Sequence, residues 1–212
     1  MFFTRLTGAR RALCGGLAVL PLAVAGLVPE AAAAPTAAPA HGARLPCPPH
    51  VPAAIDPPAS VTLAAGLAAN GVQIYVCAAP KPGEAPAWTL EGPHATLSQG
   101  KDVVAIHFAG PTWQALDGSA VKGAKLASAD APVATAVPWL LLSGTPSGSG
   151  TFGQVSHVQR LDTAGGKAPS GGCDASHLGA KVLVPYTSSY FFYRPAATGE
   201  AIQQCHSPAA KH

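Results

Sequence analysis

Charged side chains are scarce in this sequence: 13 Lys and Arg and 10 Asp and Glu together make up only 11% of its 212 residues. An amphipathic helix needs many such residues on its polar face, so the composition argues against a helical protein. Gly (23) and Pro (22) are instead abundant. This combination favours short strands joined by many turns.

The chain also has no basic segment suited to binding phosphates. Its formal net charge is +3, to which the first forty residues contribute three arginines (Arg5, Arg10 and Arg11) and one glutamate (Glu30). The remaining residues therefore carry 10 basic and 9 acidic side chains, a net charge of +1. Nucleic acid is not expected as a partner.

The first forty residues have the pattern of a signal peptide and its Ala/Pro-rich cleavage region. The apolar run Leu13–Val28 follows the arginines, is interrupted by Gly and Pro, and precedes small-residue cleavage sites at Ala33, Ala34 and Ala40. We expect a secreted or periplasmic protein with no membrane span left after cleavage. The pair Arg10-Arg11 leaves a twin-arginine export route open.

Cysteine is infrequent, with five residues in all, and Cys14 lies in the expected signal peptide. The other four are Cys47, Cys77, Cys173 and Cys205. An even number in an exported chain predicts two disulfides, for which three connectivities are possible. None of the four has Cys-x-x-Cys or zinc-finger spacing, so a metal-binding role is not expected for them.

The mature region divides into three parts. Residues 41–59 hold six prolines, which prevent a helix or a central strand, and we interpret them as an extended arm. Residues 60–195 contain alternating or wholly apolar segments every eight to fifteen residues and form the expected domain. Residues 196–212 are a polar tail.

Within 60–195 the period-two alternation predicts strands rather than helices. We expect them at 71–77, 87–91, 103–108, around Trp113, and at 121–128, 137–142, 154–161 and 181–193. Asn70-Gly71 and Gly92-Pro93 are expected turns, and 143–150 an expected loop. The predicted fold class is all-β: a single antiparallel sandwich or barrel with disulfide-tied N- and C-terminal flanks.

Seven short motifs in this region occur in a characteristic order. They are Gly71–Cys77, His107–Trp113, Asp117–Ser119, Pro138–Leu141, Gln159–Gly166, Gly172–Asp174 and Val184–Thr187. Together they resemble a family of small secreted bacterial and fungal proteins known as domain of unknown function 3455, over about residues 52–195. The resemblance implies export and a β-rich domain, and it implies no established activity.

The resemblance also suggests a disulfide pairing. Cys77 and Cys173 lie inside the region of resemblance, whereas Cys47 and Cys205 lie outside it, in the arm and the tail. We therefore expect the bonds Cys77–Cys173 and Cys47–Cys205. In each of the two other connectivities, Cys47 and Cys205 would be bonded separately to a cysteine of the domain and not to each other.

Some fungal relatives carry a malate dehydrogenase label, which would require a dinucleotide fingerprint. Gly148–Gly153 formally matches one. The fingerprint works only at the start of a helix, because helix amides hold the pyrophosphate, and the next segment here alternates like a strand. We interpret it as a flexible loop and expect no nicotinamide or other cofactor.

Three residues have the types of an acyl-transfer triad: His107, Asp117 and Ser119. Ser119 does not lie in a strained elbow, however, but in Asp-Gly-Ser, where such side chains usually hydrogen-bond the turn backbone. A structural turn and a buried strand histidine are the favoured interpretation. The alternative is a secreted hydrolase or metal-dependent enzyme that uses His107 and Asp117.

Four histidines are candidate metal ligands: His94, His107, His157 and His177. Imidazole suits zinc or copper. Their spacings contain no i,i+2 or i,i+4 pair, so no metal site is expected.

Tryptophan offers the remaining functional candidate. Aromatic residues in strands usually belong to the core, and Trp139 lies in the most apolar run. Trp113 follows Gly110-Pro111 and precedes Gln114, so we expect it to be the more exposed residue and to contact a small molecule or glycan. The favoured function is a binding or envelope-associated module of unknown activity.

Overall fold

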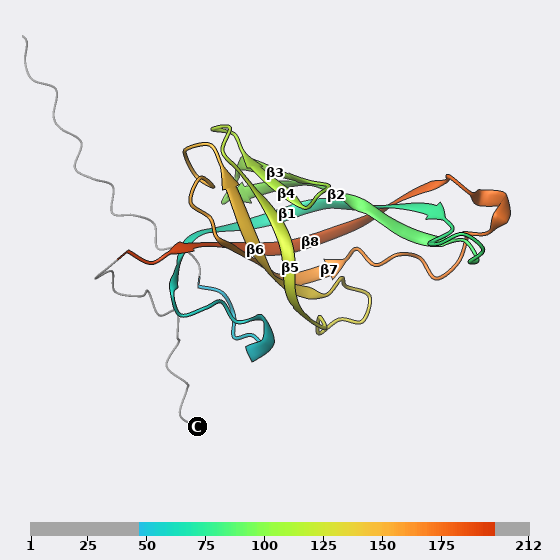
Figure 1. The fold of residues 1–212 in the computed structure, drawn as a ribbon, viewed down its shortest axis with the longest axis horizontal. Coiled ribbons are helices and arrows are strands. Elements are labelled where there is room, and N and C mark those ends of the chain that lie inside the picture. The colour runs from blue at the N-terminus through green and yellow to red at the C-terminus, as the bar shows by residue number, and fades with distance from the viewer. Residues whose placement is uncertain (1–46, 198–212) are drawn as a thin grey trace, which may run out of the picture. The chain divides into compact units, whose positions relative to one another are not determined.

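A single sheet of eight strands closes on itself as a barrel in the computed structural model, which describes residues 47–197 (Figure 1). Each strand pairs antiparallel with the next, and the last pairs with the first. The prediction of an all-β antiparallel fold is confirmed, and of the two architectures it is the barrel. The strands are β1 (Val61–Ala78), β2 (Ala87–Gln99), β3 (Asp102–Phe108), β4 (Thr112–Ala115), β5 (Ala120–Ala129), β6 (Trp139–Ser147), β7 (His157–Gly165) and β8 (Lys181–Pro195).

The barrel interior is filled by the inward-facing residues of these strands. Leu142, Val158 and Phe192 are buried there, while their neighbours Leu141 and Phe191 belong to a different apolar cluster. Because successive side chains of a strand point to opposite faces, the two clusters lie on the two faces of the sheet. An eight-stranded barrel has an interior just wide enough for side chains or for one small ligand.

The second cluster lies outside the barrel and is covered by the proline-rich arm. Ile55 of the arm is fully buried, and its carbonyl oxygen accepts a 2.7 Å hydrogen bond from Gln159 Nε2. The hydroxyl of Tyr193 donates to Gln159 Oε1 at 2.8 Å. The arm is not wholly extended as we expected: Ala53–Ile55 form a 3-10 turn, η1, in the proline-free gap between Pro52 and Pro57.

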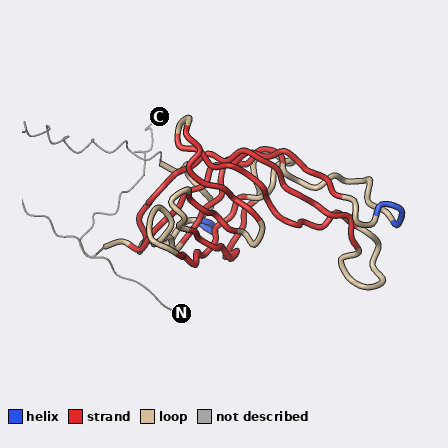
Figure 2. The backbone as a smooth tube through the Cα atoms, turned by 90° about the horizontal axis from the view of Figure 1, so that it is seen from above, coloured by secondary structure: helices blue, strands red, loops and turns tan. Residues whose placement is uncertain are grey.

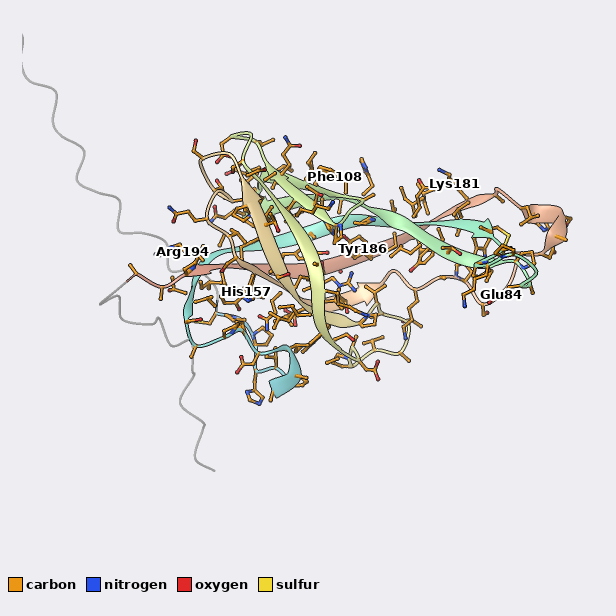
Figure 3. All side chains as sticks on the ribbon, viewed as in Figure 1. Glu84, Phe108, His157, Lys181, Tyr186 and Arg194 are labelled. Carbon is orange, nitrogen blue, oxygen red and sulfur yellow. A yellow bond between two sulfur atoms is a disulfide. The ribbon has the colours of Figure 1, made fainter. Side chains whose placement is uncertain are left out.

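Three strands continue beyond the barrel as an extension. Residues 87–93 of β2 and 181–185 of β8 pair only with β1. Figures 1 and 2 show this extension running to the right, with the short helix η2 (Ala175–His177) at its tip. In Figure 3, Lys181 lies on the extension, whereas His157 and Arg194 lie at the opposite end.

A disulfide closes the tip of the extension. Cys77 and Cys173 are bonded with a Cα–Cα distance of 5.3 Å, which confirms this predicted pair, and the sulfurs are seen near Glu84 in Figure 3. The bond joins the end of β1 to the loop between β7 and β8. Cys47 is disulfide-bonded, but Cys205 lies outside the described residues, so the pairing Cys47–Cys205 stays a prediction.

Two expected turns are instead parts of strands, since Asn70-Gly71 lies inside β1 and Gly92-Pro93 inside β2. Gly71 is needed for close packing, because a Cβ there would lie 2.2 Å from the carbonyl oxygen of His94 on β2. Pro93 lies in a part of β2 that pairs with β1 alone, and an edge position of this kind tolerates proline better than a central strand does.

The prediction of a loop over residues 143–150 was wrong for its first half, since β6 continues to Ser147. The polar residues there are partly or fully exposed. They are compatible with a strand because the outer face of a barrel wall meets solvent.

Candidate ligand-binding site

A cavity of about 270 Å³ opens at the barrel end from which the extension projects. Seven of the eight strands contribute to it, and the turn between β3 and β4 completes its wall. The lining residues are Gln73, Leu90, Glu91, Gly92, Pro93, His107, Gly110, Pro111, Trp113, Leu140, Leu142, Arg160 and Tyr190. We call this cavity the mouth pocket.

Three buried hydrogen-bond donors of the mouth pocket have no partner. Gln73 Nε2, Trp113 Nε1 and the Tyr190 hydroxyl make no hydrogen bond to any residue in the described range. Their side chains are almost completely buried, with 2%, 1% and 1% exposure. A buried donor without a partner costs about 1–3 kcal/mol. All three residues line one cavity, and a polar ligand bound there would supply the missing acceptors after small rotations of these side chains.

A fourth donor, the hydroxyl of Tyr186, lies close to this group. It is buried, and the hydroxyl of Tyr190 is its polar neighbour. Burial raises the pKa of Tyr186 far above its ordinary value, and the neighbouring Tyr190 adds to the effect. The phenol of Tyr186 therefore keeps its proton and remains a donor.

Arg160 brings a positive charge to the mouth pocket. It lies directly opposite Tyr190 in the β7–β8 register, and its Nε and Nη2 donate to the carbonyl oxygen of Pro138 at 3.1 and 2.8 Å. Within residues 47–197 it forms no ion pair. The other charged lining residue, Glu91, is paired with Lys181 at 2.6 Å.

His107 is buried and uncharged. Its Nδ1 lies 2.8 Å from the carbonyl oxygen of Thr112, and because a carbonyl only accepts, Nδ1 carries the proton. Burial first, and then the charge of Arg160, lowers the pKa of His107 to about 4, although the bond to Thr112 acts in the opposite direction. The ring stacks on Trp113 with centroids 4.4 Å apart and meets Tyr190 edge-on at 5.1 Å.

Asp117 and Ser119 lie at the opposite end of the barrel, where they hold the loop between β6 and β7. Asp117 Oδ2 accepts from the amide and hydroxyl of Thr151 at 2.8 and 2.7 Å, and Oδ1 accepts from the amide and hydroxyl of Ser119 at 2.9 and 2.5 Å. These four hydrogen bonds, led by the Ser119 hydroxyl, keep the pKa of Asp117 far below its ordinary value. Ser119 Oγ in turn accepts from the amide of Phe152 at 3.0 Å.

The loop held in this way closes that end of the barrel. Phe152 is fully buried in the interior cluster and packs against Phe192 with ring centroids 4.5 Å apart. The mouth pocket is therefore the open end of the same interior. The loop contains the formal fingerprint Gly148–Gly153, and β7 follows it instead of a helix, so its geometry is that of a hairpin connection.

The structure does not bring the three triad candidates together. His107 pairs with Trp113 near the β3–β4 turn, whereas Asp117 lies beyond the other end of β4, in the turn that leads to β5. No hydrogen bond joins His107 to Asp117 or Ser119 in the part of the chain described. The geometry gives Asp117 and Ser119 a structural role and leaves His107 in the wall of the mouth pocket.

Trp113 is not the exposed residue that the sequence indicated, since only 1% of it is accessible. The inward face of β4 directs it into the barrel, where Gly123 leaves room: a Cβ at Gly123 would lie 2.9 Å from the indole ring. It nevertheless lines the mouth pocket. Sequence reasoning missed Gln73 and Arg160, although Arg160 alternates in phase with the buried Val158. Tyr190 is one of the strand aromatics expected in the core, and it also lines the mouth pocket.

The four histidines are spread over β2, β3, β7 and η2. His177 bonds the carboxylate of Asp174 at 2.8 Å at the tip of the extension, and His157 contacts the hydroxyl of Ser156 at 3.1 Å. Among residues 47–197, no three His, Cys, Asp or Glu side chains are grouped closely enough to hold a metal ion.

A larger hollow of about 540 Å³ lies at the closed end, against the β6–β7 loop and Arg194. No buried side-chain polar atom of its described lining lacks a partner. Its geometry therefore gives less reason to expect a specific ligand.

The described residues include no helix of the length and apolar character needed to cross a membrane. Comparison with known proteins gave no matching curated protein and no matching solved structure. One sequence family does match, over residues 98–194, a range that contains His107, Trp113, Arg160 and Tyr190 but not Gln73. This part of the chain, from the end of β2 to β8, belongs to the family described as "Protein of unknown function (DUF3455)".

Proposed function

We propose that this protein is an exported, disulfide-stabilised barrel module that binds a small molecule in the mouth pocket. The observation that carries the proposal is the set of three buried donors, Gln73 Nε2, Trp113 Nε1 and the Tyr190 hydroxyl, around one cavity without partners among the described residues. Polar groups buried in a protein interior normally have partners. A ligand with hydrogen-bond acceptors would supply them.

The form of the cavity supports binding more than catalysis. Its wall consists of paired strands, which hold the lining side chains in fixed positions before a ligand arrives. The hydroxyl of Ser119, a candidate nucleophile, is engaged by Asp117 and Phe152 at the other end of the barrel. One ring nitrogen of His107 is hydrogen-bonded to a backbone carbonyl oxygen, and the ring stays uncharged.

Export is supported by the pattern of the first forty residues and by the Cys77–Cys173 disulfide, because such bonds persist in oxidising compartments. The N-terminal sequence of the protein recovered from periplasm or medium tests this part of the proposal. It should begin between residues 32 and 41. An uncleaved Met1 in a membrane fraction would contradict it.

The binding part is tested with two tryptophan variants. Trp113→Phe keeps an aromatic ring in the wall but removes the unpartnered Nε1–H. Trp139→Phe is the matched control, because Trp139 Nε1 is also buried and without a partner in the described range, yet Trp139 does not line the mouth pocket. A fragment library is screened by thermal shift against the wild-type mature protein, and affinities of the hits are measured by calorimetry.

Trp113→Phe should weaken binding of the hits by about 2- to 10-fold, the effect of one neutral hydrogen bond, without lowering the stability of the unliganded protein by more than about 1 kcal/mol. Trp139→Phe should leave the affinities unchanged. Equal effects of the two substitutions, or no hits at all, would refute ligand binding in the mouth pocket.

A further inference from the structure

We propose that the ligand of the mouth pocket is a small carboxylate with an apolar body, and that Arg160 binds its carboxylate group. This inference rests on the proposed function, because it names the chemistry of the ligand that the same pocket would take. Three features of the pocket support it: its charge, the part of the guanidinium that remains available, and the chemistry of the other lining groups.

The charge of the pocket wall is positive. Glu91 is the acidic residue of the lining, and Lys181 neutralises it at 2.6 Å. His107 is neutral, and Arg160 has no acidic partner in the described part of the chain. One guanidinium charge is therefore left for a ligand. Its field also reaches Tyr75 and Tyr186, whose pKa values it lowers against the larger effect of burial.

The guanidinium of Arg160 keeps one edge available. Nε and one N–H of Nη2 face the carbonyl oxygen of Pro138. A guanidinium has five N–H groups, so the two on Nη1 and the second on Nη2 remain, and they make no hydrogen bond within residues 47–197. The Nη1–Nη2 edge has the spacing that binds both oxygens of a carboxylate. The two hydrogen bonds to the carbonyl oxygen of Pro138 fix the guanidinium in position to bind the carboxylate.

The uncharged polar groups favour the same headgroup. Trp113 Nε1 and Gln73 Nε2 can only donate, and the Tyr190 hydroxyl can donate as well. A carboxylate only accepts hydrogen bonds, and it has about four acceptor positions. A neutral alcohol or amine would bring additional donors to a wall whose unpartnered groups are already donors.

The remaining lining residues indicate the size and the polarity of the rest of the ligand. Leu90, Pro93, Pro111, Leu140 and Leu142 give apolar surface around the polar groups. The volume of about 270 Å³ equals the liquid volume of about nine water molecules. Monocarboxylates with a single ring or a short chain fit this space.

The experiment compares carboxylates with their amides. Calorimetry at pH 7 and low salt measures the affinity of the mature wild-type protein for benzoate and benzamide, phenylacetate and phenylacetamide, and hexanoate and hexanamide. Each pair has nearly the same shape and differs in charge and in donor content. We expect the carboxylate to bind at least 10-fold more tightly than its amide.

Arg160→Gln should then lower the affinity for the carboxylates by about 10- to 100-fold and change that for the amides by less than 3-fold. Lys125→Gln, on the exposed part of β5, is the control with the same change in net charge and should have no effect. If Arg160→Gln does not fold because it loses the hydrogen bonds to Pro138, the comparison of carboxylates with amides on the wild-type protein still tests the inference.

Amides that bind as tightly as carboxylates would overturn this inference while ligand binding in the pocket stands. A folded Arg160→Gln variant with unchanged carboxylate affinity would overturn it as well. If neither the six probes nor any member of the fragment library binds, the proposed function itself fails and this inference fails with it.

Discussion

The buried neutral His107 should make the stability of the protein depend on pH in a defined range. The unfolded chain takes up a proton at this residue below its ordinary pKa of 6.5, whereas the folded protein takes it up only near 4. Because the pKa is lower in the folded state, the unfolded state binds more protons between these values. Stability is therefore fully present above pH 6.5 and is lost as the pH falls towards 4.

The gap between 6.5 and about 4 corresponds to about 3 kcal/mol of unfolding free energy, with a slope approaching 1.4 kcal/mol per pH unit. The side chain is only 3% exposed, so solvent screening reduces this figure little. The cause is physical: burial opposes a positive charge on the ring, and the nearby charge of Arg160 repels it. About 2 kcal/mol should already be lost at pH 5.

Urea unfolding between pH 8 and pH 4.5 measures this effect on wild type and on His107→Gln, which does not titrate but keeps an N–H group for Thr112. Burial also lowers the pKa of His157, but that contribution is common to both proteins and cancels in their difference. The wild type should lose stability more steeply than the variant between pH 6.5 and 4.5. Parallel curves would show that His107 is not held neutral by burial.

Three further predictions concern the rest of the barrel. Ser119→Ala should destabilise the protein by about 1–3 kcal/mol in urea unfolding, because the buried amide of Phe152 loses its acceptor; an unchanged midpoint would contradict the role given to this turn. Gly71→Ala should cost about 1–3 kcal/mol or more, because its Cβ would meet backbone of β2, whereas Gly171→Ala, with open space around it, should be neutral. Peptide mapping without reduction should yield a Cys47–Cys205 peptide, and a Cys47–Cys77 or Cys47–Cys173 peptide would contradict the pairing.

The strands were predictable from sequence because each barrel strand has one face inside. That arrangement produces the period-two alternation over residues 71–77 and in the segment from Gln154 to Leu161. The closure of the sheet was not predictable, because the pairing of β1 with β8 depends on the whole meander and not on any local pattern. Asn70-Gly71 shows the same limit. The pair resembles a turn signal, but the glycine is required because the backbone of β2 approaches β1 closely at this position.

The mouth pocket was predictable only in part. The sequence indicates Trp113 as a ligand contact, although through an exposure that this residue does not have. Gln73, Arg160 and Tyr190 come from β1, β7 and β8, and only the closed barrel brings them to one cavity. A sequence pattern can show that Arg160 shares a strand face with Val158, but it cannot show that this face is the inside.

The most direct test of ligand binding in the mouth pocket is the indole region of a ¹⁵N–¹H NMR spectrum. The chain has three tryptophans, and each gives one Nε1–H signal that a Trp→Phe variant assigns. Trp88 Nε1 already donates to the carbonyl oxygen of Gly171 at 2.8 Å, and Trp139 lies outside the pocket. Titration with the tightest-binding probe should shift the Trp113 signal alone and saturate with the calorimetric affinity, because Nε1 gains an acceptor. A shift confined to Trp88 or Trp139, or an unmoved Trp113 signal at saturation, would contradict the account.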